Sequence, residues 1–226
     1  MTGLFAFPER ARFDQRLNRD KLFRQAGGNK AIRALYEQQV DRIEWAFKLF
    51  QKTVNLPPGN GVAEINVFRV TLRGPTLDDR VLAHLDKAIP QRTWFELIRT
   101  SPDGPEVQVA AAYKRRSEAD RAQMVTLEHV RSNWAPAVAP RAPLPAAISL
   151  EGLYAGMLRA LWPHAPRAGE SLRAQAERLS NAAVQAKAVA RLTTQVRRER
   201  DFAVQIDRNR ELRAAQAAWK DLTDTA

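Results

Sequence analysis

The feature that most constrains the fold is an unbroken run of helix-forming residues towards the C-terminus. Residues 168–222 contain one glycine, Gly169, and no proline, and they are rich in Ala, Arg, Glu and Gln. Because these residue types have high helix propensity, the sequence predicts that the segment is almost wholly helical. One continuous helix would be about 80 Å long at 1.5 Å per residue, whereas a helical hairpin would fold back near Arg198–Phe202. The absence of a glycine or proline breaker slightly favours the single helix.

An apolar seam of roughly heptad spacing runs along this segment, which is typical of a coiled-coil arm. Its members are Leu172, Leu179, Ala182, Ala186, Val189, Val196, Ala203 and Ile206. The alanines make the seam too shallow for an independent core, so we expect the arm to have one less exposed side. That side should carry Leu172, Leu179, Val189, Val196 and Ile206.

The same segment predicts a contact with another protein. A lone helix would leave several apolar residues in water, and such a patch marks a partner-binding site. The residues concerned are Val196, Phe202, Ile206, Leu212 and Trp219. Between Arg191 and Arg213, seven arginines are interleaved with four acidic residues, a mixture typical of a solvated helix face rather than of a DNA-binding basic region. We therefore expect the arm to contact a protein first and nucleic acid second.

The N-terminal part predicts an α+β body. Asn29 is a suitable N-cap, and apolar residues at helical spacing follow it, so residues 30–51 are predicted to be a helix. Residues 1–16 are expected to be irregular. Strands are predicted at 62–73, 93–100, 106–116 and 124–131, and a short helix at 79–88. The expected fold class is α+β, with a small antiparallel sheet in the order β-α-β-β-β, packed with N-terminal helices and followed by the helical arm.

Prolines suggest the domain boundaries. Residues 135–148 are rich in proline and alanine and are expected to form an extended connection. This gives a body over residues 1–134 and a helical arm over residues 149–226. Within the arm we expect a helix at 149–162 and the long helix or hairpin at 168–222.

Charge and composition narrow the class of protein. There are 36 Lys and Arg against 25 Asp and Glu, which gives a net charge of +11. This charge favours a polyanionic partner, although a GC-rich genome would also enrich arginine. The chain has no cysteine, no signal-peptide pattern and no apolar stretch long enough to span a membrane, so we expect a cytoplasmic protein.

No complete catalytic set is recognisable in the sequence. The three histidines, His84, His129 and His164, are isolated from one another, and phosphate-binding and nucleophile motifs are missing, so we expect no metal and no cofactor. An atypical nuclease centre would use Asp86, Glu96 and Lys114. Nuclease chemistry of that kind needs an acid two residues before the lysine, where this chain has Ala112.

A basic stretch suggests a contact with nucleic acid. Alternation along a strand places Tyr113 and Arg115 on one face and Lys114 and Arg116 on the other. An aromatic residue beside a basic cluster is a plausible contact to phosphates and bases. The alternative, which we favour, is a buried tyrosine followed by solvated charges at the end of a strand.

Several short motifs resemble those of the bacterial domain-of-unknown-function family numbered 4391. They are Ile43–Trp45 with Lys48–Leu49, Leu85–Pro90, Phe95–Leu97, Ala111–Arg115, Gly169–Leu172, and Glu199–Phe202 followed by Asn209 and Leu212. The resemblance implies no assigned activity. It implies that the gene lies near those of helicases and DNA methyltransferases in restriction or phage-defence loci. Within the shared motifs, the residues to test first are Asp86, Lys87, Glu96, Tyr113 and Lys114. The arm departs from the resemblance, because alanine and arginine stand where such arms often have lysine and larger apolar residues.

The leading hypothesis is a non-enzymatic accessory protein of a bacterial DNA-processing system. Its body would contact DNA, and its arm would bind a helicase, a methyltransferase or a second copy of the chain. The alternatives are the metal-dependent nuclease and a structural scaffold without any contact to nucleic acid.

Overall fold

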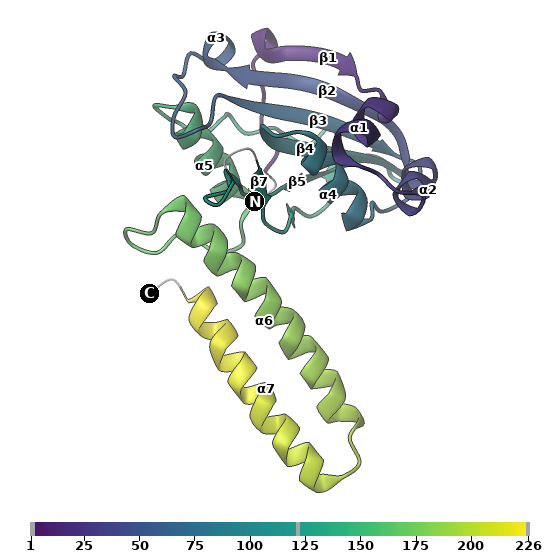
Figure 1. The fold of residues 1–226 in the computed structure, drawn as a ribbon, viewed down its shortest axis with the longest axis vertical. Helices are drawn as coiled ribbons and strands as arrows, with labels where there is room; N and C mark the ends of the chain where they lie inside the picture. The colour runs from purple at the N-terminus through teal and green to yellow at the C-terminus, as the bar shows by residue number, and fades with distance from the viewer. Residues whose placement is uncertain (1–2, 121–122, 225–226) are drawn as a thin grey trace. The chain divides into compact units, whose positions relative to one another are not determined.

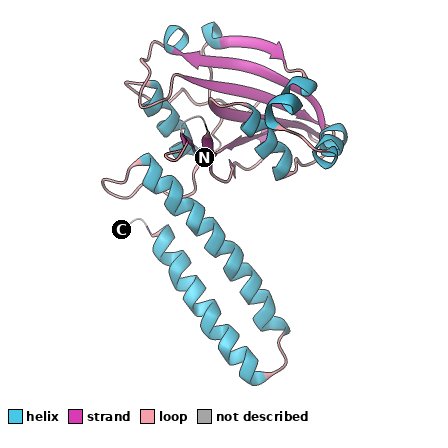
Figure 2. Cartoon of the chain, in the orientation of Figure 1, coloured by secondary structure: helices cyan, strands magenta, loops and turns pink. Residues whose placement is uncertain are grey.

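The computed structural model describes residues 3–120 and 123–224, and the chain separates into two compact units, residues 1–162 and 163–226. The first unit combines a sheet with several helices, and the second contains two long helices (Figures 1 and 2). A mixed α+β fold with a mostly antiparallel sheet and C-terminal helices, as the sequence predicts, is thereby confirmed.

The sheet of the first unit is built around five strands in spatial order. These are β1 (Arg12–Arg16), β2 (Val40–Phe50), β3 (Glu64–Leu72), β4 (Arg92–Ser101) and β5 (Gly104–Ala111). The short strands β8 (Val130–Arg131) and β9 (Ala135–Pro136) both pair with β5. Within this described sheet only β3 and β4 run parallel, and α4 (Asp79–Ala88) supplies the crossover that a parallel pair requires.

The helix predicted over residues 30–51 is wrong in its second half. Helix α2 (Lys30–Gln39) begins at the Asn29 cap, but the chain continues from Val40 as the long strand β2. The register between β2 and β3 shifts twice, between Val40 and Arg42 and between Trp45 and Phe47. Each shift changes the alternation of side chains, so the buried positions of this strand imitate the spacing of a helix.

Three other expectations for the body differ from the structure. The expected irregular lead contains the short helix η1 (Glu9–Ala11) and β1, which pairs with β2. The strand expected at 106–116 is divided into β5 and β6 (Lys114–Arg116), which belong to different sheets. The single strand expected at 124–131 is likewise two short ones. β7 (Met124–Thr126) pairs with β6 in a separate two-stranded sheet, whereas β8 joins the main sheet.

Helices cover both faces of the main sheet. On one face, α1 (Arg19–Ala26), α2 and α4 pack over a core that includes Phe68, Val70, Phe95 and Leu97. On the other face, α5 (Leu150–Leu161) and the N-terminal segment pack around Trp94, whose ring lies 5.6 Å from that of Phe5. The remaining helix, α3 (Gln51–Val54), follows β2 directly.

The division into units differs from the boundaries expected at 134 and 149. Helix α5 belongs to the first unit, because the Tyr154 hydroxyl donates to the Ala112 carbonyl and Met157 is fully buried. The preceding connection also pairs with the body, through a bridge between Phe5 and Ala142. The second unit therefore begins only after Trp162.

The second unit is a helical hairpin, which decides between the two arrangements open for the arm. Helix α6 (Leu172–Arg198) and helix α7 (Phe202–Thr223) lie antiparallel and in contact (Figure 1). The turn needs neither glycine nor proline. Asp201 caps α7 by accepting hydrogen bonds from the Ala203 and Val204 amides, and the Glu199 carboxylate accepts from the Arg200 and Asp201 amides.

Candidate functional site

A closed cluster of polar side chains lies beneath the end of α4. The Lys114 ammonium, from β6, donates to Asp86 Oδ1 at 2.9 Å, to the Asp86 carbonyl at 2.8 Å and to the Ile89 carbonyl at 2.5 Å. Thr93, at the start of β4, donates its hydroxyl to the same carboxylate. His129 Nε2 lies 3.2 Å from Asp86 Oδ2. The cluster thus ties α4, β4, β6 and the loop before β8 together.

The electrostatics of this cluster are those of a closed ion pair. Burial by itself would raise the pKa of Asp86, but the adjacent His129 and the charge of Lys114 hold it below its usual value. Burial lowers the pKa of the Lys114 ammonium, and the carboxylate of Asp86 opposes that shift. Both side chains are at most 1% exposed, so this pair has exchanged water for a nearly complete set of protein partners.

A cavity of about 790 Å³ adjoins the cluster, and its lining includes Asp86, His129, Asp79, Glu128 and Lys87. Carboxylates and an imidazole are suitable metal ligands by type. In residues 3–120 and 123–224, however, no three His, Asp or Glu side chains are grouped so that they could share a metal ion. The carboxylate of Asp86, which contributes to the lining of this cavity, is already paired with the Lys114 ammonium.

Glu96, the third member of the hypothetical nuclease centre, is not brought to Asp86 and Lys114. Side chains alternate along β4, so Thr93 and Phe95 point to the α4 face and Glu96 points to the opposite one. There Glu96 is 0% exposed and is bound by Arg69, 3.1 Å away, and by Arg141. The structure thus supplies two separate buried ion-pair clusters on the two faces of the sheet.

The basic stretch 113–116 divides between the interior and the surface. Lys114 is closed to solvent and has its donors occupied, so it is not available to a phosphate without opening the cluster. Tyr113 and Arg115 are half-buried, and Arg116 is exposed. Arg116 lines a hollow of about 280 Å³ beside the loop that joins α4 to β4.

Neither Thr93 nor His129 stands out in the sequence, although both contact Asp86. His129 lies between β7 and β8 and not in the single strand expected at 124–131, and the other two histidines stay apart from this cluster. His84 Nδ1 is 3.0 Å from the Tyr36 hydroxyl, and the His164 carbonyl accepts a hydrogen bond from Gln175. No local motif marks Thr93 or His129, because only the tertiary fold brings them to Asp86.

The family model described as Domain of unknown function (DUF4391) matches residues 5–218, nearly the whole chain. The chain belongs to the DUF4391 family. Comparisons with curated proteins and with solved structures find no significant match. The DUF4391 match extends over both compact units, so the hairpin is part of the family's domain and not an appendage to it.

The predicted partner residues of this DUF4391 protein lie along the hairpin and differ in exposure. Phe202 is 74% exposed, Ile206 46% and Trp219 40%, whereas Val196 and Leu212 are half-buried. The expectation that Ile206 lies on the less exposed side is therefore wrong. It sits one turn after Phe202, on a side of α7 that α6 does not cover.

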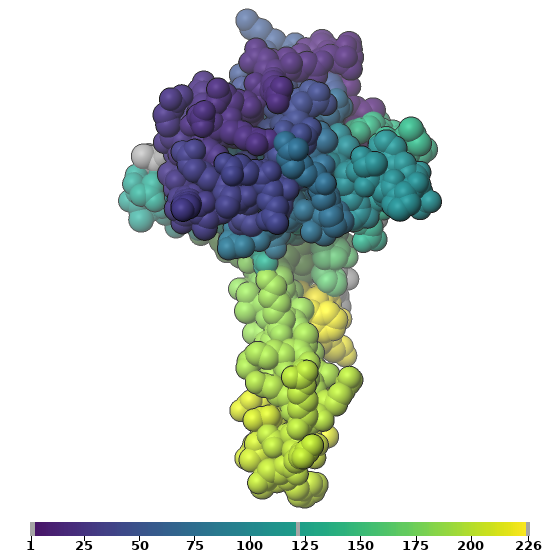
Figure 3. All heavy atoms as spheres, turned by 90° about the vertical axis from the view of Figure 1, so that its right-hand side faces the viewer, coloured from purple at the N-terminus to yellow at the C-terminus, as the bar shows by residue number. Residues whose placement is uncertain are grey.

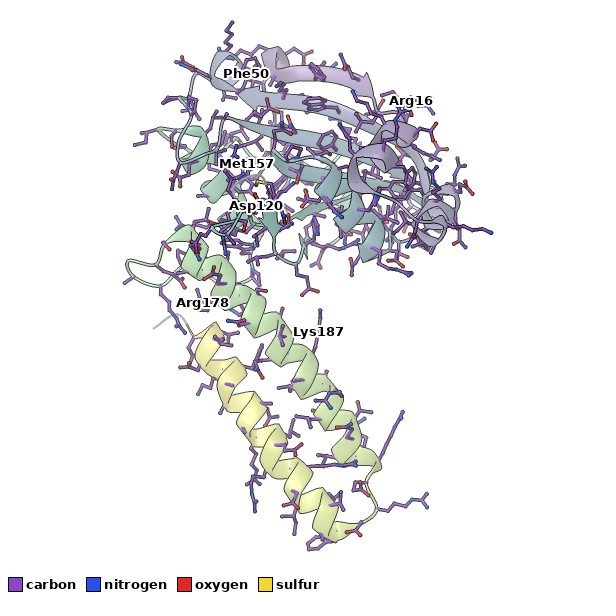
Figure 4. All side chains as sticks on the ribbon, viewed as in Figure 1. Arg16, Phe50, Asp120, Met157, Arg178 and Lys187 are labelled. Atoms are coloured by element: carbon purple, nitrogen blue, oxygen red, sulfur yellow. The ribbon has the colours of Figure 1, made fainter. Side chains whose placement is uncertain are left out.

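Two arginines close the base of the hairpin, and one of them, Arg167, donates to the Asp221 and Asp224 carbonyls at the end of α7. Arg178, labelled in Figure 4, binds Glu170 through two parallel contacts of 2.6 and 2.7 Å. Arg178 also donates to the Leu222 carbonyl at the end of α7 and to the Ala165 carbonyl.

In the described part of the chain no helix has the length and apolar character needed to cross a membrane.

Proposed function

We propose that this DUF4391 protein is a non-catalytic accessory protein of a bacterial DNA-processing system, of the restriction or phage-defence kind. Its hairpin binds a protein partner, a helicase, a methyltransferase or a second copy of the chain, and its α+β body contacts DNA. The resemblance of its motifs to the family is the reason for proposing a restriction or phage-defence system. The surface of the hairpin is the main support for a role in binding.

The observation that carries the proposal is that α7 has no buried residue along its whole length, Phe202–Thr223. The helix nevertheless carries Phe202, Val204, Ile206 and Trp219 with at least 40% of each exposed. Seen edge-on, the hairpin is a narrow column in which α6 faces the viewer and α7 lies largely behind it (Figure 3). The apolar residues Phe202, Val204 and Ile206 span just over one turn at the start of α7, and such a group is suited to insertion into a groove of a partner.

The DNA half of the proposal is supported by charge. The net charge is +11, and Arg115 and Arg116 stand at the end of the basic stretch where they are at least partly exposed. The nuclease alternative gains no comparable support. Its three residues are engaged in two closed clusters on opposite faces of the sheet.

The partner half is tested by comparative capture. Tagged full-length protein, the double variant Phe202→Ser/Ile206→Ser and the control Lys187→Ser are used as baits in cells of the native host, and bound proteins are quantified. Lys187 is an exposed α6 residue that points away from α7 (Figure 4). We expect one protein to be depleted about tenfold or more with the double variant and retained with the control, because exposed aromatic anchors dominate such interfaces. Equal capture by all three baits would refute the hairpin as the docking element.

The DNA half is tested by measuring affinity for duplex and single-stranded DNA over a series of salt concentrations. Phosphate contacts release counterions, so affinity should fall steeply and log-linearly as salt rises. Binding that is absent at low salt would remove the DNA half and leave the scaffold alternative.

A further inference from the structure

Arg92 is a buried arginine that forms no ion pair with a described residue. It is the first residue of β4 and is 7% exposed. Its Nε has no hydrogen-bond partner, and no carboxylate of the described residues forms an ion pair with it. The ring of Tyr154 lies 5.9 Å from the guanidinium carbon.

Such an arrangement is costly unless something compensates it. Burial lowers the pKa of the Arg92 guanidinium, and the like charge of Arg116 acts in the same direction. Tyr154, Tyr113 and Glu151 oppose this shift but do not cancel it. The other arginines buried to a similar degree have partners, as Arg178 has with Glu170. A buried guanidinium that has no carboxylate partner in the protein is suited to an anion that comes from outside.

The hollow beside Arg92 has room for such an anion. It measures about 280 Å³, and its lining includes Arg92, Arg116, Gln91 and Gly61. Glu64 also lines it, but that carboxylate is 2.9 Å from the Lys48 ammonium and accepts a further hydrogen bond from the Asn66 amide. The negative charge of Glu64 is thus already paired, and Arg92 is the guanidinium of this wall whose Nε has no hydrogen-bond partner.

We propose that this hollow binds a phosphate group, held between the forked donors of Arg92 and Arg116. A tetrahedral phosphate offers several oxygens and can accept from two guanidiniums at once, and arginine forks match this geometry. The identification of that phosphate as one in the backbone of a DNA strand rests on the DNA half of the proposed function. The phosphate site itself does not depend on it.

The test uses the full chain with inorganic phosphate and with a short labelled single-stranded oligonucleotide, both at constant ionic strength. The variants are Arg92→Met, Arg116→Met and the control Arg24→Met, which removes the same charge from an exposed position on α1. Calorimetry measures phosphate binding, anisotropy measures oligonucleotide binding, and circular dichroism checks the fold. We expect Arg92→Met and Arg116→Met to weaken phosphate binding about 10- to 100-fold, the effect of losing one or two hydrogen bonds to a charged group. Arg24→Met should bind phosphate as the parent does.

The outcomes separate this inference from the proposed function. Phosphate binding that needs Arg92 and Arg116, together with oligonucleotide binding that needs them too, supports both. Phosphate binding that needs them, without oligonucleotide binding, supports the site and removes the DNA half. Oligonucleotide binding that is equal in the parent and in all three variants shows that the bound phosphate is not one of DNA, and it leaves the DNA half standing. Phosphate binding that is equal in the parent and in all three variants overturns the site. Failure of the parent protein to bind phosphate also overturns the site. Because Arg116 is exposed, Arg116→Met keeps the test decisive if Arg92→Met does not fold.

Discussion

The Lys114 ammonium lies 2.9 Å from Asp86 Oδ1, and this ion pair is closed to solvent on all sides. It joins the crossover helix α4 to β6, so two motifs separated in the sequence form one structural unit. Asp86 also contributes to the lining of the cavity of about 790 Å³.

This pair should show strong energetic coupling. Lys114→Met leaves a buried carboxylate without its cation, and Asp86→Leu leaves a buried ammonium without its anion, so each should lower the free energy of unfolding by about 3–5 kcal/mol. The double variant should lose much less than the sum, because no unpaired charge remains. Urea unfolding of the four proteins measures this. Additive losses would show that the two side chains do not act as a pair.

Acid should weaken the hairpin through Glu170. The contacts with Arg178 lower the pKa of Glu170 from 4.5 to about 2. A carboxyl group whose folded pKa is depressed contributes its full stability above the unfolded value, and the contribution disappears as the pH falls from about 4.5 to about 2. Glu170→Gln should therefore be less stable than the parent near neutrality, and the difference should shrink across this range. Glu211→Gln, an exposed change on α7, is the control. A difference that stays constant with pH would contradict this account.

The apolar residues at the turn of the hairpin should contribute little to its own stability. Phe202 and Ile206 are 74% and 46% exposed, so replacing both by serine should change the free energy of unfolding by no more than about 0.5 kcal/mol. Leu192→Ser removes a buried α6 residue and should be clearly destabilising by the same measurement. Similar losses for the two sites would mean that Phe202 and Ile206 belong to the hairpin's core rather than to a binding surface.

The sequence predicts the α+β class and the helical C-terminal segment because both depend on local composition. It does not predict β2, because the bulges at Val40–Arg42 and Trp45–Phe47 disturb the alternation by which a strand is recognised. The turn of the hairpin had a local signal after all. Asp201 is a good N-cap in front of the apolar residue Phe202, and its side chain caps the start of α7 directly after α6 ends, without a glycine or proline in the turn.

The candidate sites were only partly accessible to sequence reasoning. Asp86 and Lys114 lie in recognisable motifs, but Thr93 and His129 become their neighbours only through the crossover and the two-stranded sheet. Arg92 carries no signal at all. An arginine after Pro90 is ordinary in a sequence, and its significance comes from burial without a carboxylate partner, which only a three-dimensional structure reveals.

The central claim is that α7 meets a protein partner, and site-specific photo-cross-linking in cells of the native host tests it most directly. A photoreactive phenylalanine analogue replaces Phe202 or Ile206 in the full-length protein, and Lys187 in the control, whose side chain points away from α7 (Figure 4). The account predicts a light-dependent adduct of one discrete mass at both α7 positions and none at the control position. Absence of an adduct at Phe202 and Ile206, or the same adducts at all three positions, would contradict it.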